Sequence, residues 1–156
     1  YTDPQATFYG DISTVSLNEN VTENAISIIV SDLDSAESSL IYTLSGADAA
    51  DMTISNSGNI SFNVAPNYET KNQYVINLSV SDGVLTTSQP ITINILDVND
   101  GPVINGLAST FSYVENSTAD VVTLNVTDED ADSLTYYLTD TGFNPGLGDA
   151  AELSIS

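Results

Sequence analysis

Asp97-Val98-Asn99-Asp100-Gly101-Pro102 is a short acidic segment that follows the strand-like run 91–96 and ends in a proline. Three of its first four side chains are carboxylates or amides. The 156-residue chain has one Lys, Lys71, and no Arg or His, so we do not expect a basic side chain to neutralise this segment. Hard oxygen ligands in a short loop are what Ca²⁺ prefers. The segment therefore predicts a calcium-dependent architecture rather than a catalytic centre.

The composition excludes several classes of protein. A net charge of −21 would repel nucleic acids and anionic membrane surfaces. The absence of Cys and His excludes disulfides, thiolate zinc sites and a Ser-His-Asp triad. No apolar run approaches the length of a membrane span, so we expect no membrane insertion. A hydrophobic content of 41% is enough to form a core.

The sequence repeats itself along the chain. Leu17-Asn18-Glu19-Asn20 is similar to Tyr113-Val114-Glu115-Asn116, and Asp32-Leu33-Asp34 is similar to Asp128-Glu129-Asp130. Both pairs have an offset of 96 residues, from 19 to 115 and from 32 to 128. Repetition at a fixed period indicates a tandem array. A period of about 100 residues is that of a small sandwich domain, not of a solenoid turn.

The local pattern is that of β-strands. Apolar residues alternate with polar ones over residues 74–80 and 91–95, which is the pattern of strands with one buried and one exposed face. Asn56-Ser57-Gly58-Asn59 is expected to form a hairpin turn. Because no convincing amphipathic helix is present, we predict an all-β fold, an antiparallel Greek-key sandwich.

The predicted domains are a complete repeat over residues 1–102 and the N-terminal half of a second repeat over residues 103–156. By analogy with the first repeat, the second lacks its last three strands. Such a half-sandwich would expose a core face and an open sheet edge. Two explanations stay open. Either the sequence is truncated, or another chain supplies the strands, which would make the protein a self-assembling fibre subunit.

Short acidic motifs follow one another along the chain: Glu19-Asn20, Asp32-Leu33-Asp34, Asn67-Tyr68-Glu69, Ser81-Asp82-Gly83 and Asp97 to Pro102, followed by Glu115-Asn116 and Asp128-Glu129-Asp130 in the second repeat. With these motifs in this order, the first repeat resembles the cadherin repeats, including the bacterial cadherin-like repeats of large surface adhesins. The sequences Val80-Ser81-Asp82-Gly83 and Asp97 to Pro102 are closer to those of the bacterial adhesins than to those of animal cell-adhesion proteins.

The resemblance implies that Ca²⁺ ions bind at the junction between consecutive repeats. The implied ligands are the side chains of Glu19 and Glu69, those of Asp97 and Asp100 with the backbone carbonyls of Val98 and Asn99, and those of Asp128 and Asp130. The corresponding upper half-site of the first repeat, which would face a preceding repeat, consists of Asp32, Asp34 and Asp82.

The sequence departs from the family pattern at two ligand positions. Asn67 stands where animal cadherins usually have Asp, and Gly101 stands where Asn is usual. The first change costs one ion a charged ligand, and the second costs the ion nearest the second repeat a side-chain ligand. We therefore expect about two ions at this junction, since each Ca²⁺ takes six to eight oxygens.

Three functions are considered for a chain with this sequence. The first is a calcium-rigidified structural repeat of an extracellular surface adhesin or filament, with neighbouring repeats or subunits of the same kind as partners. The second is a carbohydrate-binding module of a secreted polysaccharide-degrading enzyme, although the sequence shows no clear row of aromatic residues. The third is a catalytic domain, which we do not expect because nearly all the acidic residues fall at domain ends rather than around a pocket.

Overall fold

The computed structural model describes residues 5–23, 25–33, 36, 39–112 and 114–137. The chain forms two compact units, residues 1–99 and residues 100–156. No helix among the described residues is long and apolar enough to span a membrane.

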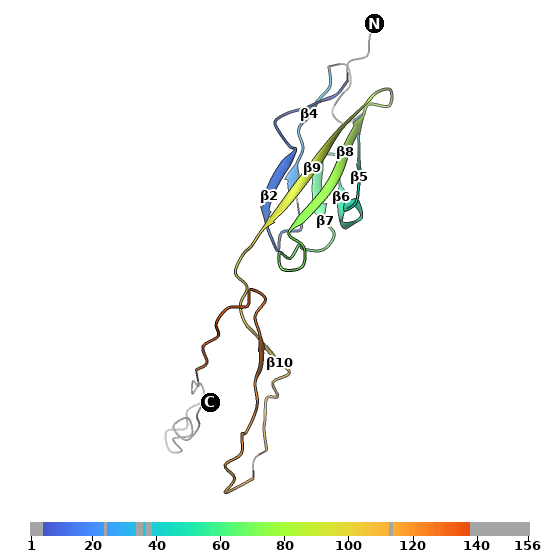
Figure 1. Ribbon diagram of the computed structural model, residues 1–156. Helices are drawn as coiled ribbons and strands as arrows, with labels where there is room; N and C mark the ends of the chain where they lie inside the picture. The colour runs from blue at the N-terminus through green and yellow to red at the C-terminus, as the bar shows by residue number, and fades with distance from the viewer. Residues whose placement is uncertain (1–4, 24, 34–35, 37–38, 113, 138–156) are drawn as a thin grey trace, which may run out of the picture. The chain divides into compact units, whose positions relative to one another are not determined.

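The larger sheet of the first unit has four strands, and its centre is a long hairpin. Strands β8 (Gln73–Ser81) and β9 (Thr86–Leu96) pair antiparallel along the full length of β8. Strand β5 (Ile41–Ser45) pairs antiparallel with β8, and β2 (Thr14–Asn18) pairs parallel with β9. The order is therefore β2-β9-β8-β5, as Figure 1 shows.

The second sheet has three strands in the order β3-β7-β6. Its strands are β3 (Ile26–Ser27), β7 (Asn59–Phe62) and β6 (Met52–Ile54), all paired antiparallel. The predicted turn at residues 56–59 connects β6 to β7. Its Gly58 has φ 79, and an added Cβ there would lie 2.8 Å from the carbonyl oxygen of Ile28, so glycine is required. A short 3-10 helix, η2 (Ala49–Asp51), precedes β6, and a separate ribbon pairs β1 (Thr7–Phe8) with β4 (Val30–Ser31).

The core lies between the two sheets and follows the alternation read from the sequence. On β8 and over residues 91–95 of β9, every second residue is buried, and full burial of one such side chain contributes about 1.5–3 kcal/mol to stability. The predicted all-β sandwich is confirmed. The pairing of β2 with β9 is parallel, however, whereas we predicted antiparallel strands. The buried residues of the two strands are Tyr74, Ile76, Leu78, Val80, Ile91, Ile93 and Ile95, and they pack with Ile26, Met52, Ile60 and Phe62 of the second sheet.

The second unit begins with a ribbon that repeats the register of the first. Strand β10 (Val103–Asn105) pairs antiparallel with β11 (Asn125–Thr127). The pair Thr7↔Ser31 of β1 and β4 corresponds to Val103↔Thr127, at the offset of 96 read from the sequence. Positive φ values recur at the same offset: Gly10 (80) with Gly106 (66), and Asn20 (66) with Asn116 (61).

These correspondences agree with an internal repeat at the level of the backbone. The boundaries 1–102 and 103–156 stay predictions, and residues 138–156 are outside the described part of the chain.

Candidate metal centre

Glu19 has the most unusual environment of the predicted ligands. It follows the last residue of β2 and is 2% exposed, which makes it the one buried charged residue in the described part of the chain. Its Oε2 accepts a hydrogen bond from the backbone N–H of Tyr68 at 2.9 Å, and its Oε1 accepts one from the N–H of Val98 at 2.8 Å. Each carboxylate oxygen has two acceptor positions, so each keeps one for another partner.

The backbone next to Glu19 is held by further hydrogen bonds. The N–H of Glu19 donates to the carbonyl of Leu96 at 3.1 Å, and the N–H of Asn20 donates to the carbonyl of Pro66 at 3.0 Å. Asn20 has φ 66, a left-handed conformation that Asn adopts more readily than most residues. The end of β2, the loop before β8 and the segment after β9 therefore meet at one carboxylate.

Glu69 and Asp97 bring further negative charge to this point of the first unit. A carboxylate oxygen of Glu69 lies within 4.8 Å of a carboxylate oxygen of Glu19. A carboxylate oxygen of Glu69 also lies within 4.8 Å of one of Asp97. Two carboxylates at this separation repel each other by about 3 kcal/mol at an effective dielectric of 20. Lys71 is the only basic side chain of the sequence. A bound cation would offset this repulsion.

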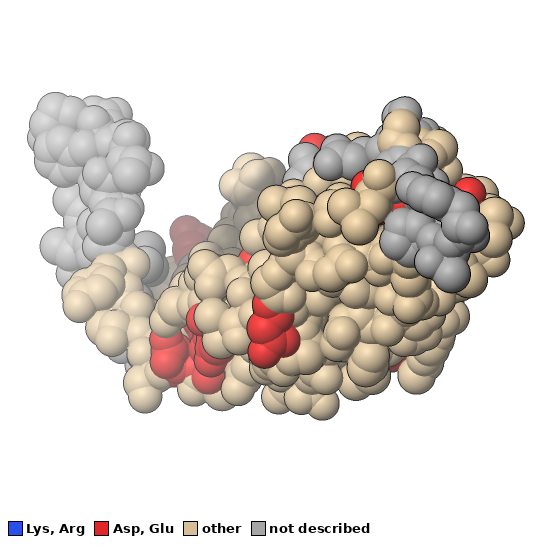
Figure 2. All heavy atoms as spheres, turned by 90° about the horizontal axis from the view of Figure 1, so that it is seen from above, with Lys and Arg blue, Asp and Glu red and all other residues tan. Residues whose placement is uncertain are grey.

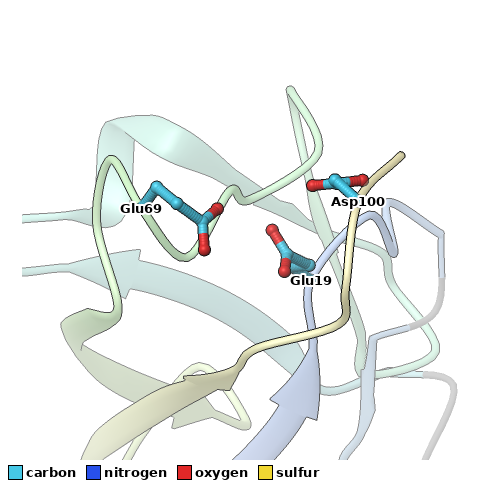
Figure 3. Close-up of side chains that lie close together, drawn as sticks. All are labelled: Glu19, Glu69 and Asp100. Carbon is cyan, nitrogen blue, oxygen red and sulfur yellow. The ribbon is translucent and has the colours of Figure 1, made fainter. Parts of the chain in front are cut away.

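Figure 3 shows the carboxylates of Glu19 and Glu69 close to each other in the first unit. Asp100 is the first residue of the second unit. Within the second unit, the backbone N–H of Asp100 donates to the carboxylate of Asp130 at 2.6 Å. The carboxylate of Asp128 accepts the N–H of Asp132 at 3.2 Å. The predicted ligands of the second unit are thus Asp100 and Asp130, which are joined by a hydrogen bond, and Asp128 close to them in sequence.

The predicted upper half-site of the first unit is described in part. Oδ1 of Asp82 accepts the backbone N–H groups of Val84 at 2.7 Å and Leu85 at 2.8 Å, which fixes the turn between β8 and β9. Oδ2 of Asp82 is shielded from solvent and has no hydrogen-bond partner, and Oδ2 of Asp32 is shielded as well. Asp34 lies outside the described residues. A buried carboxylate oxygen without a partner is costly unless a cation or water completes it.

A second charged cluster, which the sequence analysis missed, surrounds Lys71. The Nζ atom of Lys71 lies 2.5 Å from Asp48 and 3.2 Å from Asp51, and it stacks 4.2 Å from the ring centre of Tyr74. The hydrogen bond from Lys71, with a second from the N–H of Val75, lowers the pKa of Asp48. Asp48 in turn raises the pKa of Lys71. The only feature of the sequence that points to this cluster is that a single Lys is present among 22 acidic residues.

The surface agrees with the composition. Seen from above, it carries separate acidic side chains, and no basic side chain is visible among the residues described on that face (Figure 2). The side-chain atoms near Glu19 that could bind a metal are carboxylate oxygens, and the chain has no Cys or His. Hard oxygen donors suit Ca²⁺, whereas Zn²⁺ and Cu²⁺ favour nitrogen and sulfur ligands. The residues present therefore fit a calcium ion.

Comparisons with known proteins agree on one fold. No protein-family model and no curated protein matches the chain. Among solved structures, human protocadherin-24 EC1-2 matches with a TM-score of 0.58 and 23% identity over 81% of this chain and 61% of that one. Human CDH23 EC21-23 gives 0.55 and 18%, covering 80% and 44%. Protocadherin gamma B2 extracellular cadherin domains 1-5 gives 0.53 and 20%, covering 80% and 26%.

The likeness extends over most of this chain and over about three fifths of the first of these structures. Identities of 18 to 24% show a shared fold and no more. The cadherin resemblance read from the ordered sequence motifs is thereby confirmed as a structural one. The chain has the β-sandwich fold of cadherin extracellular domains.

Proposed function

We propose that this chain is a calcium-binding structural or adhesive repeat of an extracellular surface adhesin or filament, in which Ca²⁺ makes the junction after the first repeat rigid. The observation that carries the proposal is the buried carboxylate of Glu19. It is held by two backbone N–H groups, keeps acceptor positions free, and lies beside the carboxylate of Glu69. Such a group is costly to bury in a pure scaffold and useful in a metal site.

The ligand set of the proposal joins residues of three segments. Glu19 and Glu69 come from the end of the first unit, Asp97 and Asp100 with the carbonyls of Val98 and Asn99 come from the linker, and Asp128 and Asp130 come from the second unit. Asp32, Asp34 and Asp82 would form the half-site that faces a preceding repeat, supported by the buried Oδ2 of Asp82. When bound, Ca²⁺ supplies the positive charge that these carboxylates lack.

The biological setting is part of the proposal. Ca²⁺ sites of this kind suit an extracellular location, and the solved structures with this fold are cadherin domains. We place the chain on a bacterial surface because the sequences of residues 80–83 and 97–102 are closer to those of bacterial adhesins than to those of animal cell-adhesion proteins. The partners proposed are neighbouring repeats or subunits of the same kind. No observation supports the carbohydrate-binding alternative.

The experiment is thermal unfolding in millimolar Ca²⁺, in chelator and in Mg²⁺. A ligand present at one hundred times its Kd stabilises the folded state by about 2.7 kcal/mol per site. For a chain of this size that raises the Tm by about 5–10 °C. An equal Tm in Ca²⁺ and chelator would contradict the proposal, and an equal rise with Mg²⁺ would contradict selectivity for Ca²⁺.

Asp100→Ala is the variant for the same experiment. It removes the carboxylate and keeps the backbone N–H that bonds to Asp130. The Tm should therefore fall in Ca²⁺ and change little in chelator. Equal destabilisation in both conditions would show that Asp100 is not a calcium ligand.

Self-assembly by strand complementation is a second part of the proposal, supported by exposed apolar residues of the second unit. Ile26 and Ile28 of the first unit are 7% and 5% exposed. Their counterparts at the offset of 96, Val122 and Leu124, are 40% and 38% exposed. Val122 and Leu124 would be buried by strands equivalent to those that cover Ile26 and Ile28. Such strands could come from further residues of the same chain or from another copy of it.

Sedimentation velocity separates these alternatives for the 156-residue chain. Donation of strands between copies predicts oligomers or polymers whose population rises with protein concentration. A dispersed monomer at all concentrations would contradict strand donation and leave the calcium proposal intact.

A further inference from the structure

The loop that carries Glu69 connects β7 to β8 and is fixed at both of its ends. At the first end, the carbonyl of Pro66 accepts the N–H of Asn20 at 3.0 Å, and the N–H of Tyr68 donates to Glu19. At the other end, the carbonyl of Asn72 accepts the N–H of Ile95 at 2.9 Å. These are all contacts with β2, β9 or the turn after β2, on the side of the candidate metal centre.

Between its two fixed ends, the loop forms a turn from Asn67 to Lys71. The N–H of Lys71 donates to the carbonyl of Asn67 at 2.9 Å, and the N–H of Thr70 donates to the side-chain oxygen of Asn67 at 2.8 Å. Glu69 lies inside this turn, two residues before Lys71. Its backbone position is therefore determined by what holds Asn67 and Lys71.

The side chain of Lys71 contacts residues outside the loop that carries Glu69. Its ammonium group contacts Asp48 and Asp51, which cap and end η2, and stacks on the ring of Tyr74 of β8. Asp48 is itself fixed to β8, because its carboxylate accepts the N–H of Val75 at 2.6 Å and its own N–H donates to the Val75 carbonyl at 3.3 Å.

We infer that Lys71 is a positioning residue for the candidate calcium site, which holds the turn bearing Glu69 in place by anchoring it to η2 and β8. The inference rests on the proposed function and adds a residue that is not itself a ligand. Neither the motif resemblance nor the acidic pattern pointed to Lys71. Removing a residue that orients a metal ligand typically weakens metal affinity by about 10–100-fold.

The positive charge of Lys71 by itself predicts the opposite effect on calcium affinity. The direction in which the Kd for Ca²⁺ changes on substitution therefore tests the positioning role. Lys71 is the only cation of the chain and lies two residues from a proposed ligand, so its charge repels Ca²⁺. If Lys71 acted only through its charge, Lys71→Met would bind Ca²⁺ more tightly. If it positions the turn, the same variant binds Ca²⁺ more weakly.

The experiment measures the Kd for Ca²⁺ by titration calorimetry, on the full chain and at a temperature where circular dichroism shows each variant folded. The double variant Lys71→Met with Asp51→Asn keeps the net charge and removes the anchor. We expect its Kd and that of Lys71→Met to rise about tenfold. Asp51→Asn alone keeps the contact with Asp48 and should leave the Kd within about threefold, and Lys71→Arg should restore binding.

Amide hydrogen exchange in chelator gives a second readout that needs no metal. The N–H of Thr70, which bonds to Asn67, should exchange faster in Lys71→Met than in Asp51→Asn, because only the former frees the turn. If Lys71→Met does not fold, Asp48→Asn weakens the same anchor and replaces it in both measurements.

An unchanged or lower Kd in Lys71→Met and in the charge-matched double variant would overturn the inference, even if their Tm falls. In that case Lys71 serves folding only. A chain that binds no Ca²⁺ before any substitution would overturn the proposed function and this inference together, so the two failures are distinguishable.

Discussion

At the scale of single residues, one buried carboxylate organises the end of the first unit. Glu19 joins the end of β2 to residues that are 49 and 79 positions further along the chain. Both of its bonds go to backbone N–H groups, so they do not depend on the identity of the side chains at positions 68 and 98. A buried charge is costly unless hydrogen bonds or an opposite charge offset its loss of hydration.

Glu19→Gln tests this role with a side chain of the same shape. The amide has one acceptor oxygen, so one of the two backbone N–H groups faces an NH₂ group and loses its acceptor. We expect a loss of about 1–3 kcal/mol in the free energy of unfolding in chelator. The additional stabilisation by Ca²⁺ should disappear as well. Urea unfolding with and without Ca²⁺ measures both effects.

Glu23→Gln is the matched control, since Glu23 is exposed in the same segment. It should change neither quantity by more than about 0.5 kcal/mol. Equal effects of the two substitutions would show that Glu19 has no special part in stability or in calcium binding.

The pH dependence of stability is a second prediction at this scale. Lys71 and the N–H of Val75 lower the pKa of Asp48 below its usual value of 3.8. A carboxyl group with a lowered folded-state pKa contributes stability that is fully present above its unfolded pKa and is lost as the pH falls through the folded value. We therefore expect the contribution of Asp48 to be lost below about pH 4, so that lowering the pH over that range costs Asp48→Asn less stability than it costs the unsubstituted chain.

Urea midpoints between about pH 6 and pH 2, at constant ionic strength, measure this difference. Asp51→Asn serves as the comparison, because its carboxylate is more exposed and lies farther from Lys71. If Asp48→Asn and the unsubstituted chain lose stability in parallel, the contact with Lys71 contributes nothing to acid stability.

At the scale of elements, the β8–β9 hairpin contributes seven of the fifteen buried hydrophobic residues found in the described part of the chain. The alternation of apolar residues predicted which face of each strand is buried, because side chains of a strand point alternately to its two faces. Leu78 is 0% exposed, whereas Val75 on the same strand is 45% exposed. The two positions are therefore a direct test of the sandwich.

Leu78→Ala should lower the free energy of unfolding by about 2–5 kcal/mol, since the lost methyl groups leave a cavity. Val75→Ala should cost less than about 1 kcal/mol, because its side chain is half exposed. Chemical unfolding in chelator, where calcium does not contribute, measures both. Similar costs at the two positions would contradict the assignment of the buried face.

At the scale of the whole molecule, net charge dominates the behaviour of the calcium-free chain. The charge of −21 is spread over 156 residues with one basic side chain. Such self-repulsion destabilises a compact state, and salt screens it. Raising the ionic strength from about 0.01 M to about 1 M shortens the Debye length from about 30 Å to about 3 Å.

The Tm in chelator should therefore rise as NaCl is added over this range. In Ca²⁺ the rise should be smaller or reversed, because the carboxylates around Glu19 are already neutralised and NaCl weakens ion binding. Differential scanning calorimetry measures both series. A Tm that falls with NaCl in chelator would show that repulsion among the carboxylates does not limit stability.

The sequence by itself determined the alternating strands at the centre of the fold. Period-two alternation is local, so it predicted the buried faces of β8 and of residues 91–95 of β9. The offset of 96 read from the acidic motifs recurs in the register of the two ribbons. The motifs also predicted Glu19 and Glu69 as neighbours, whereas a metal ion bound to them stays a prediction. The predicted antiparallel sandwich did not include the parallel pairing of β2 with β9.

Only the tertiary structure decided the contacts between distant segments. The parallel pairing of β2 with β9, the hydrogen bonds of Glu19 to Tyr68 and Val98, and the anchoring of Lys71 by Asp48 all join residues at least 23 positions apart. Such contacts depend on how the two sheets pack, since a short motif carries no information about its distant partner. The local pattern thus predicts each strand, and the packed core determines which carboxylates meet.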